Sequence, residues 1–464
     1  MKFLPPTRIR SVIYFLAGTL FFASCQKELK LQKNQQDAIF ASTPKEKETV
    51  EVLKEVSTIL KEVYQSPNAY YEVNAAIYSD YHADERVLLK DLLFPEKSPL
   101  YKSEKFKASK AIPGEFKKTF YEVLAKSNYP YLKKAMRIST TQNNLRSIAP
   151  VPTDTAMEIF SNSNGVSIYF PYSENFGSLF TPAYFDNINT DPWGNLATVI
   201  PADREADSAP GSIPSRRKRT VNNVIEWYIH YTSVTVNDIY AETHPTHIVG
   251  VGAESIMVVQ DDPPTAPGIN RVFHGWSILN DQLDRFISFS GNGGGSEMKI
   301  ARISGYLQIQ NQQVSDFTGD VMTVHYKRKD INKEKWKRVY GVWDADWKTD
   351  NLEQTYAVWE DDTQGTKTYT GSLSTTVTIS PGNTATGAIG YSIQVQTQDE
   401  LVTQRKLTRT AYFGGAKADQ GWGFQMCDKD GTCRYDDTFL PTGQYWPKYD
   451  EGTIWSYTWP YNIY

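Results

Sequence analysis

Residues 43–63 read TPKEKETVEVLKEVSTILKEV and carry the clearest periodic pattern in the chain. Thr43 and Glu46 match a capping box, and Pro44 occupies the first helical position. Apolar residues then recur at spacings of three and four, as on one face of a helix: Val52, Val56, Ile59, Leu60 and Val63. The segment therefore predicts an amphipathic helix that starts at Pro44.

Similar helical patterns continue to about residue 136, and strand patterns follow. From about Met157, short alternating runs are separated by Gly, Pro, Asn and Asp, which is typical of β structure. The segment 261–268, DDPPTAPG, divides these runs, because consecutive prolines do not fit a central strand. The predicted fold class is α+β, with a helical domain (43–136) followed by two β-rich, sandwich-like modules (150–260 and 269–464).

The composition limits the classes of partner. Apolar residues make up 40% and charged residues 22% of the 464 residues, which is ordinary for a globular protein. A net charge of −4 argues against a nucleic-acid partner, since such proteins carry a basic excess. Aromatic residues reach 13%, and they favour strands and supply stacking surfaces.

The N-terminus has the regions of an export signal. Lys2, Arg8 and Arg10 supply positive charge ahead of an apolar run over residues 12–22. This run is shorter than the about 20 residues that a membrane-spanning helix needs. Small residues then precede Cys25. The expected outcome is removal of residues 1–24 as a signal peptide.

Phe22-Ala23-Ser24-Cys25 resembles the lipobox of bacterial lipoproteins, and Gln26-Lys27-Glu28 is similar to the tags of Bacteroidota-type surface lipoproteins. The resemblance covers residues 1–28 and implies acylation of Cys25, with palmitate among the chains, and attachment to the outer membrane of the cell envelope. The polar residues 25–42 then form a flexible tether. The periplasmic and the surface-exposed side stay open. An ordinary secretory signal, with Cys25 as a free thiol, is the alternative.

The other two cysteines lie close together. Cys427 and Cys433 flank the turn signal Asp430-Gly431, so they can face each other across a hairpin. We predict a disulfide between them. An EF-hand-type calcium loop is the alternative, but Met426 stands where its first carboxylate belongs.

An acidic cluster predicts a possible cofactor, Ca²⁺. If the predicted strands near 336–343 and 353–360 pair as a hairpin, carboxylates that follow them converge, and Ca²⁺ prefers oxygen ligands. The predicted ligands are Asp344, Asp346, Glu360 and Asp362. Neutralisation by the basic residues of 327–338 is the alternative.

The C-terminus carries a row of aromatic residues at alternate positions: Trp455, Tyr457, Trp459 and Tyr461. In a strand all four rings share one face. An exposed face of this kind would stack sugar rings and is the predicted ligand-binding surface. A buried closing strand is the alternative, while Pro460 favours a sheet edge.

Three further motifs resemble known functional sequences only in part. Arg216-Arg217-Lys218-Arg219 lies in a Pro- and Ser-rich segment and fits a solvated loop, a protease site or an anionic-lipid site. His244-Pro245-Thr246-His247 lacks the helical spacing of a zinc motif. Residues 291–297, GNGGGSE, lack a phosphate-loop lysine and predict a flexible hairpin loop.

No set of residues predicts catalysis. We expect a membrane-tethered, exported lipoprotein that binds a glycan or a protein partner without catalysis. The alternatives are a secreted hydrolase whose acid/base pair lies within the acidic cluster, and a structural protein of the envelope.

Overall fold

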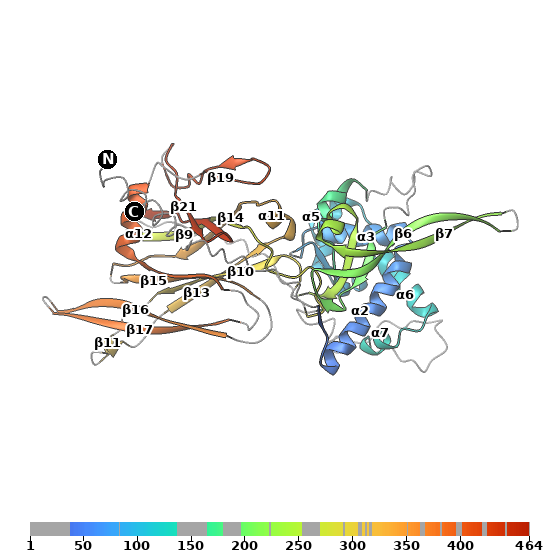
Figure 1. Ribbon diagram of the computed structural model, residues 1–464, viewed down its shortest axis with the longest axis horizontal. Helices are drawn as coiled ribbons and strands as arrows, with labels where there is room; N and C mark the ends of the chain where they lie inside the picture. The colour runs from blue at the N-terminus through green and yellow to red at the C-terminus, as the bar shows by residue number, and fades with distance from the viewer. Residues whose placement is uncertain are drawn as a thin grey trace, which may run out of the picture. The chain divides into compact units, whose positions relative to one another are not determined.

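The computed structural model describes residues 38–82, 84–136, 165–179, 196–221, 224–252, 270–290, 293–304, 309–310, 313–314, 318–349, 351–361, 367–380, 383–395, 401–419, 425–440 and 443–463. These residues form a mixed α+β structure, as predicted (Figure 1). Cys25 and the predicted signal peptide lie outside them. Among the described residues, no helix combines the length and the apolar character needed to cross a bilayer.

The N-terminal helices begin where the capping pattern predicts. Helix α2 starts at Pro44, where Thr43 Oγ1 accepts from Glu46 N at 3.2 Å and the Glu46 carboxylate accepts from Thr43 N at 2.8 Å. The helical elements of this part are α2 (Pro44–Val63), α3 (Pro67–Tyr78), α4 (Leu89–Leu93), η1 (Pro99–Lys102), α5 (Glu104–Ser109), α6 (Glu115–Lys126) and α7 (Pro130–Ala135). The predicted capping box is confirmed.

A four-stranded sheet packs with these helices. Its order is β2 (Arg86–Leu88), β3 (Val166–Tyr169), β8 (Thr246–Val251) and β4 (Thr198–Pro201), and only the β4–β8 pairing is parallel. The smaller elements nearby are β1 (Ile39–Phe40), η2 (Ser173–Leu179), β5 (Arg204–Glu205) and α10 (Asp238–Thr243).

The helices and this sheet share one hydrophobic core, which we call the first core. It joins Val56 of α2 and Phe120 of α6 to Ile168 of β3 and Ile248 of β8. Strand β2 lies within the predicted helical region and pairs with β3. The helices of 43–136 therefore have no core of their own, because their apolar faces are buried against strands that come later in the chain.

Two long strands, β6 (Ser208–Val221) and β7 (Val224–Asn237), form a ribbon beside α2 and α6 (Figure 1). The base of the ribbon belongs to the first core, where Ala209 and Val236 are buried. Gly211 permits a close approach there, since a Cβ at this position would lie 2.5 Å from Val236 Cγ2. The basic run 216–219 lies within β6, so the predicted loop at this place is wrong.

Among the described residues, the C-terminal part contains two antiparallel sheets of at least four strands. The first has the order β13 (Thr318–Tyr326), β10 (Ser296–Ser304), β15 (Glu353–Glu360) and β18 (Leu401–Thr408). The second has the order β14 (Lys337–Asp344), β9 (Asn270–Leu279), β22 (Trp455–Thr458) and β21 (Lys448–Glu451), and β23 (Tyr461–Ile463) also pairs with β9. The remaining elements are β11 (Ile309–Gln310), β12 (Gln313–Val314), α11 (Arg328–Asn332), β16 (Lys367–Ser380), β17 (Asn383–Val395), α12 (Arg409–Asp419), β19 (Met426–Cys427) and β20 (Cys433–Arg434).

Both sheets contribute side chains to one hydrophobic core, the second core. Met298 and Tyr356 come from the first sheet, and Val272 and Trp343 come from the second. Apolar faces of two sheets bury each other in this way in β-sandwiches.

The C-terminal aromatic row belongs to the second core. The exposed fractions of Trp455, Tyr457, Trp459 and Tyr461 are 0%, 0%, 1% and 4%. Their shared face meets rings of other strands, with ring centroids 4.8 Å apart for Tyr457 and Tyr356 and 4.6 Å apart for Trp459 and Trp343. The predicted ligand-binding face is therefore corrected to the buried alternative, because a ring packed against protein cannot stack on a sugar.

The predicted disulfide is formed. The sulfur atoms of Cys427 and Cys433 lie 2.17 Å apart, and the two residues are paired across β19 and β20. Gly431 adopts a positive φ of 86° in the connecting turn, which favours glycine.

We expect Trp455→Ala to lower the free energy of unfolding by about 3–5 kcal/mol, because a fully buried ring leaves a cavity. Tyr131→Ala serves as the control, since that ring is 41% exposed, and we expect a change within about 0.5 kcal/mol. Urea denaturation followed by far-ultraviolet circular dichroism measures both. Equal effects of the two substitutions would contradict the burial of Trp455.

Candidate functional site

The first and second cores meet at a polar joint formed by residues 84–86 and 293–295. Asp84 Oδ2 accepts from Gly295 N at 2.7 Å and from Arg86 Nη2 at 2.8 Å. Arg86 Nη2 also donates to Gly293 O. A Cβ on Gly295 would lie 2.3 Å from Asp84 Oδ1, so only glycine fits. The described part of the predicted flexible loop is therefore a packed contact.

Arg328 of α11 is fully buried in the same joint. Its Nε donates to Asp238 Oδ1 at 2.6 Å, and its Nη1 donates to Gly294 O at 2.8 Å and to Asp284 O at 3.2 Å. The guanidinium also lies 5.4 Å from the ring centroid of Phe286. The bonds to Asp238 and to two carbonyls offset the cost of burying this charge.

A second set of charged side chains in the polar joint is centred on Lys329. Its Nζ lies 2.9 Å from Glu85 Oε1 and 3.1 Å from Glu174 Oε2. Burial raises the pKa of Glu85 to about 7, although Lys329 favours the charged form. Glu85 thus titrates near neutral pH at the contact between the two cores.

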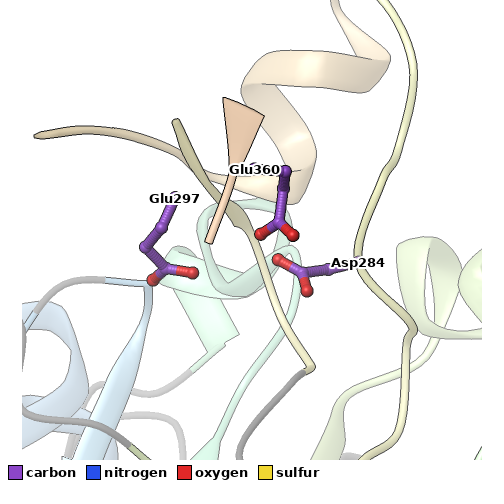
Figure 2. Close-up of side chains that lie close together, drawn as sticks. All are labelled: Asp284, Glu297 and Glu360. Atoms are coloured by element: carbon purple, nitrogen blue, oxygen red, sulfur yellow. The ribbon is translucent and has the colours of Figure 1, made fainter. Parts of the chain in front are cut away.

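Three carboxylates converge beside this joint (Figure 2). Asp284 precedes β10, Glu297 lies on β10, and Glu360 ends β15. One carboxylate oxygen from each lies within 4.8 Å of the others. Carboxylate oxygens are ligands that Ca²⁺ prefers, so these three residues have the chemistry to hold a cation.

The burial of this cluster limits catalysis. Carboxylates about 5 Å apart are the arrangement of retaining glycosidases. However, Asp284 is 7% exposed and Glu360 is 1% exposed. A polysaccharide chain cannot reach these two buried carboxylates. The half-buried Glu297 is paired with His325, whose Nδ1 lies 3.2 Å from Glu297 Oε1.

The structure does not bring the predicted calcium ligands together. Asp344 pairs with Arg302 Nη1 at 2.9 Å and accepts from Gln354 Nε2, whereas Asp346 lies 3.3 Å from Lys348 Nζ. Glu360 lies six residues beyond Gln354 along β15. At the usual strand rise it is therefore about 20 Å from Gln354, the residue that contacts Asp344. The fourth predicted ligand, Asp362, lies outside the described residues.

The physical reason is that the expected hairpin does not form. Strand β14 pairs with β9, and β15 pairs with β10 and β18, so the two strands belong to different sheets. The register Met298↔Glu360 instead brings Glu360 beside Glu297. No local pattern in the sequence indicates this pairing, because 63 positions separate the two glutamates.

A surface groove lies between α2, α6 and the β6–β7 ribbon, and we call it the polar groove. Its volume of about 790 Å³ is in the range of small-ligand sites. It is lined by Thr58, Lys61, Glu62, Gln65, Ser66, Thr119, Glu122, Val123, Lys126, Ser212 and Tyr231.

The lining of the polar groove combines one exposed ring with many hydrogen-bonding groups. The Tyr231 side chain is 43% exposed, and Lys61 Nζ lies 5.9 Å from its ring centroid. Burial lowers the pKa of Lys61. The two lysines of the lining are balanced by two glutamates, so the groove carries no strong net charge. No pattern in the sequence indicates this site, because its residues occupy the polar faces of two helices and one ribbon.

Comparisons with known proteins add no function. No protein-family model matches the chain, and neither the curated proteins nor the solved structures contain a match to it.

We expect the stability of the protein to fall as the pH rises from about 5 to about 8, partly because of Glu85. Its pKa is raised from 4.5 to about 7 on folding, so the folded state binds the proton more tightly. The contribution is full below about pH 4.5 and is lost as the pH passes about 7. Thermal midpoints of Glu85→Gln should therefore depend less on pH than those of the wild type.

Glu51→Gln is the matched control, since this glutamate lies on the outer side of α2 in a pair with Lys54. We expect its thermal midpoint to follow the pH dependence of the wild type. Identical pH profiles for Glu85→Gln and the wild type would contradict the role assigned to Glu85.

Proposed function

We propose that this protein is a lipid-anchored protein of the cell envelope that binds a carbohydrate in the polar groove without catalysis. The exposed ring of Tyr231 in a cavity lined mainly by polar residues is the observation that carries this proposal. The apolar face of a sugar ring stacks on an aromatic ring, while its hydroxyl groups need hydrogen-bond partners. The hydroxyl of Ser66 and the amide of Gln65 supply such partners. The hydroxyls of Thr58 and Thr119 donate to Lys54 O and Glu115 O, so they can still accept from a ligand.

The charge balance of the groove favours a neutral oligosaccharide. Lys61 and Lys126 are matched by Glu62 and Glu122. A phosphorylated or acidic ligand would require a basic excess, and a protein partner would require a broader contact than one cavity. The proposed sugar-binding site is thus the polar groove, in place of the C-terminal aromatic row that the sequence suggested.

The environment of the groove carboxylates favours binding over hydrolysis. Glu62 and Glu122 are both exposed to solvent. A carboxylic acid that donates a proton near neutral pH is normally held in a desolvated site that raises its pKa. A hydrolase remains the second candidate, and a purely structural protein that binds no ligand is the third.

The lipobox-like segment ending at Cys25 supports the anchored location. In the arrangement that we propose, the acyl chains on Cys25 insert into the outer membrane, and the residues between Cys25 and β1 (Ile39–Phe40) form the tether. A mixed helix–strand module up to residue 252 follows, and a sandwich-like module begins at residue 270.

We expect Tyr231→Ala to weaken carbohydrate binding at least about fivefold, because stacking on the ring contributes more than about 1 kcal/mol. Affinity electrophoresis in gels that contain a β-glucan, a xylan, a mannan or amylose measures the effect as a loss of retardation. Tyr131→Ala, with a similarly exposed ring on α7, should leave retardation unchanged.

Two results would contradict this proposal. Absence of retardation of the wild type by every polysaccharide would leave the structural role. Release of reducing ends from any of them by the wild type would favour the hydrolase.

We expect radioactive palmitate to label the wild-type chain in bacterial cells and not the Cys25→Ser variant. Acylation requires the thiol, which is the only one outside the Cys427–Cys433 disulfide. Autoradiography of the immunoprecipitated chain measures the label. Equal labelling of both chains would contradict acylation at Cys25.

A further inference from the structure

The β6–β7 ribbon is anchored at one end and carries its exposed residues at the other. Ala209 and Val236 fix the base in the first core. The strands stay paired as far as Val221↔Val224. The ten residue-to-residue steps from Gly211 to Val221 span about 33 Å at the usual strand rise. The distal end of the ribbon therefore lies far from the core that holds its base.

Positive charge is concentrated at this distal end. Arg217, Lys218 and Arg219 are exposed. Because successive side chains alternate, Arg217 and Arg219 project from one face and Lys218 from the other. The two strands contain four basic residues and one acidic residue, within a chain of net charge −4. Both faces of the ribbon thus present cations.

Apolar and aromatic groups accompany these cations. Val221, at the last pair before the turn, is 37% exposed, and Tyr228 is 38% exposed. Tyr228 lies opposite Arg217, and the Arg219 guanidinium lies 5.5 Å from its ring centroid. From the last strand pair towards the base, the order along the ribbon is therefore an exposed valine, then basic residues beside a tyrosine ring. The same order occurs across a bilayer interface, where tyrosines lie at the level of the headgroups.

We propose that the distal end of the β6–β7 ribbon, residues 217–221 with Tyr228, is a membrane-contact site for anionic phospholipid headgroups. Arg217, Lys218 and Arg219 bind lipid phosphates, and Val221 enters the boundary with the acyl chains. A headgroup layer can surround both faces of a ribbon that enters it, which suits cations on both faces. A soluble polyanion would not require the exposed Val221.

This contact is independent of the acyl group on Cys25 and of carbohydrate binding in the polar groove. A basic residue near an anionic membrane surface contributes about 1 kcal/mol, so three of them correspond to about 100-fold in membrane partitioning. The attraction is screened by salt within about 10 Å at 0.1 M ionic strength. A contact of this strength is reversible alone and would supplement an acyl anchor.

Sedimentation with vesicles of phosphatidylcholine, with and without phosphatidylglycerol, tests the proposal. The chain from Gln26 onwards is suitable, because it lacks the acylated cysteine and keeps every described helix and strand. We expect it to bind only the vesicles with phosphatidylglycerol, and less at higher salt. The variant Arg217→Ala/Lys218→Ala/Arg219→Ala should bind about 100-fold more weakly.

The control variant Lys47→Ala/Lys102→Ala/Lys118→Ala removes the same charge from exposed positions on α2, η1 and α6. It should bind like the wild type. Val221→Glu keeps all three basic residues and should also weaken binding, which covers the case that the triple ribbon variant fails to fold.

Three results would overturn the proposal. The first is equal binding to both kinds of vesicle. The second is an equal loss in the ribbon variant and the control variant, which would assign binding to net charge. The third is retention on immobilised dextran sulfate without vesicle binding, which would assign the site to a soluble polyanion. Tyr231→Ala should not change vesicle binding, so a failure of the groove proposal remains distinguishable.

Discussion

The ion pair between the buried guanidinium of Arg328 and the carboxylate of Asp238 joins the two cores of the described structure. Arg328 belongs to α11, next to the second core, but its carboxylate partner is Asp238 of α10, next to the first core. Breaking a buried ion pair by removing one partner typically costs 3–5 kcal/mol, because the other charge stays without compensation. Separation of the two cores would expose Arg328 and also the contacts of Asp84 with Arg86 and Gly295. This polar joint therefore couples two parts that each have their own hydrophobic core.

The joint also explains where a ligand can and cannot bind. The three converging carboxylates, Asp284, Glu297 and Glu360, lie beside it, and those of Asp284 and Glu360 are buried. The polar groove and the distal end of the ribbon instead lie on the side of the first core, where helix faces and a long hairpin leave rings and charges exposed. The packed residues of the polar joint thus have a structural role. The exposed residues of the polar groove and of the ribbon are the ones available for binding.

Much of the local structure could be predicted, because it depends on neighbouring residues. The capping box at Thr43, the Cys427–Cys433 bridge and the shared face of Trp455 and Tyr457 all follow from short-range spacing. The same reasoning failed where strands choose distant partners. The segments 337–344 and 353–360 are neighbours in sequence, but they pair within different sheets.

The sequence by itself determined the mixed α+β class, the start of α2, the disulfide and the expectation of an anchored cysteine at residue 25. Only the tertiary structure decided that the C-terminal aromatic row is core, that Glu360 meets Asp284, and that Tyr231 faces a groove. The physical reason is that capping and alternation act within a few residues, whereas burial and the meeting of side chains depend on which strands pair across the chain.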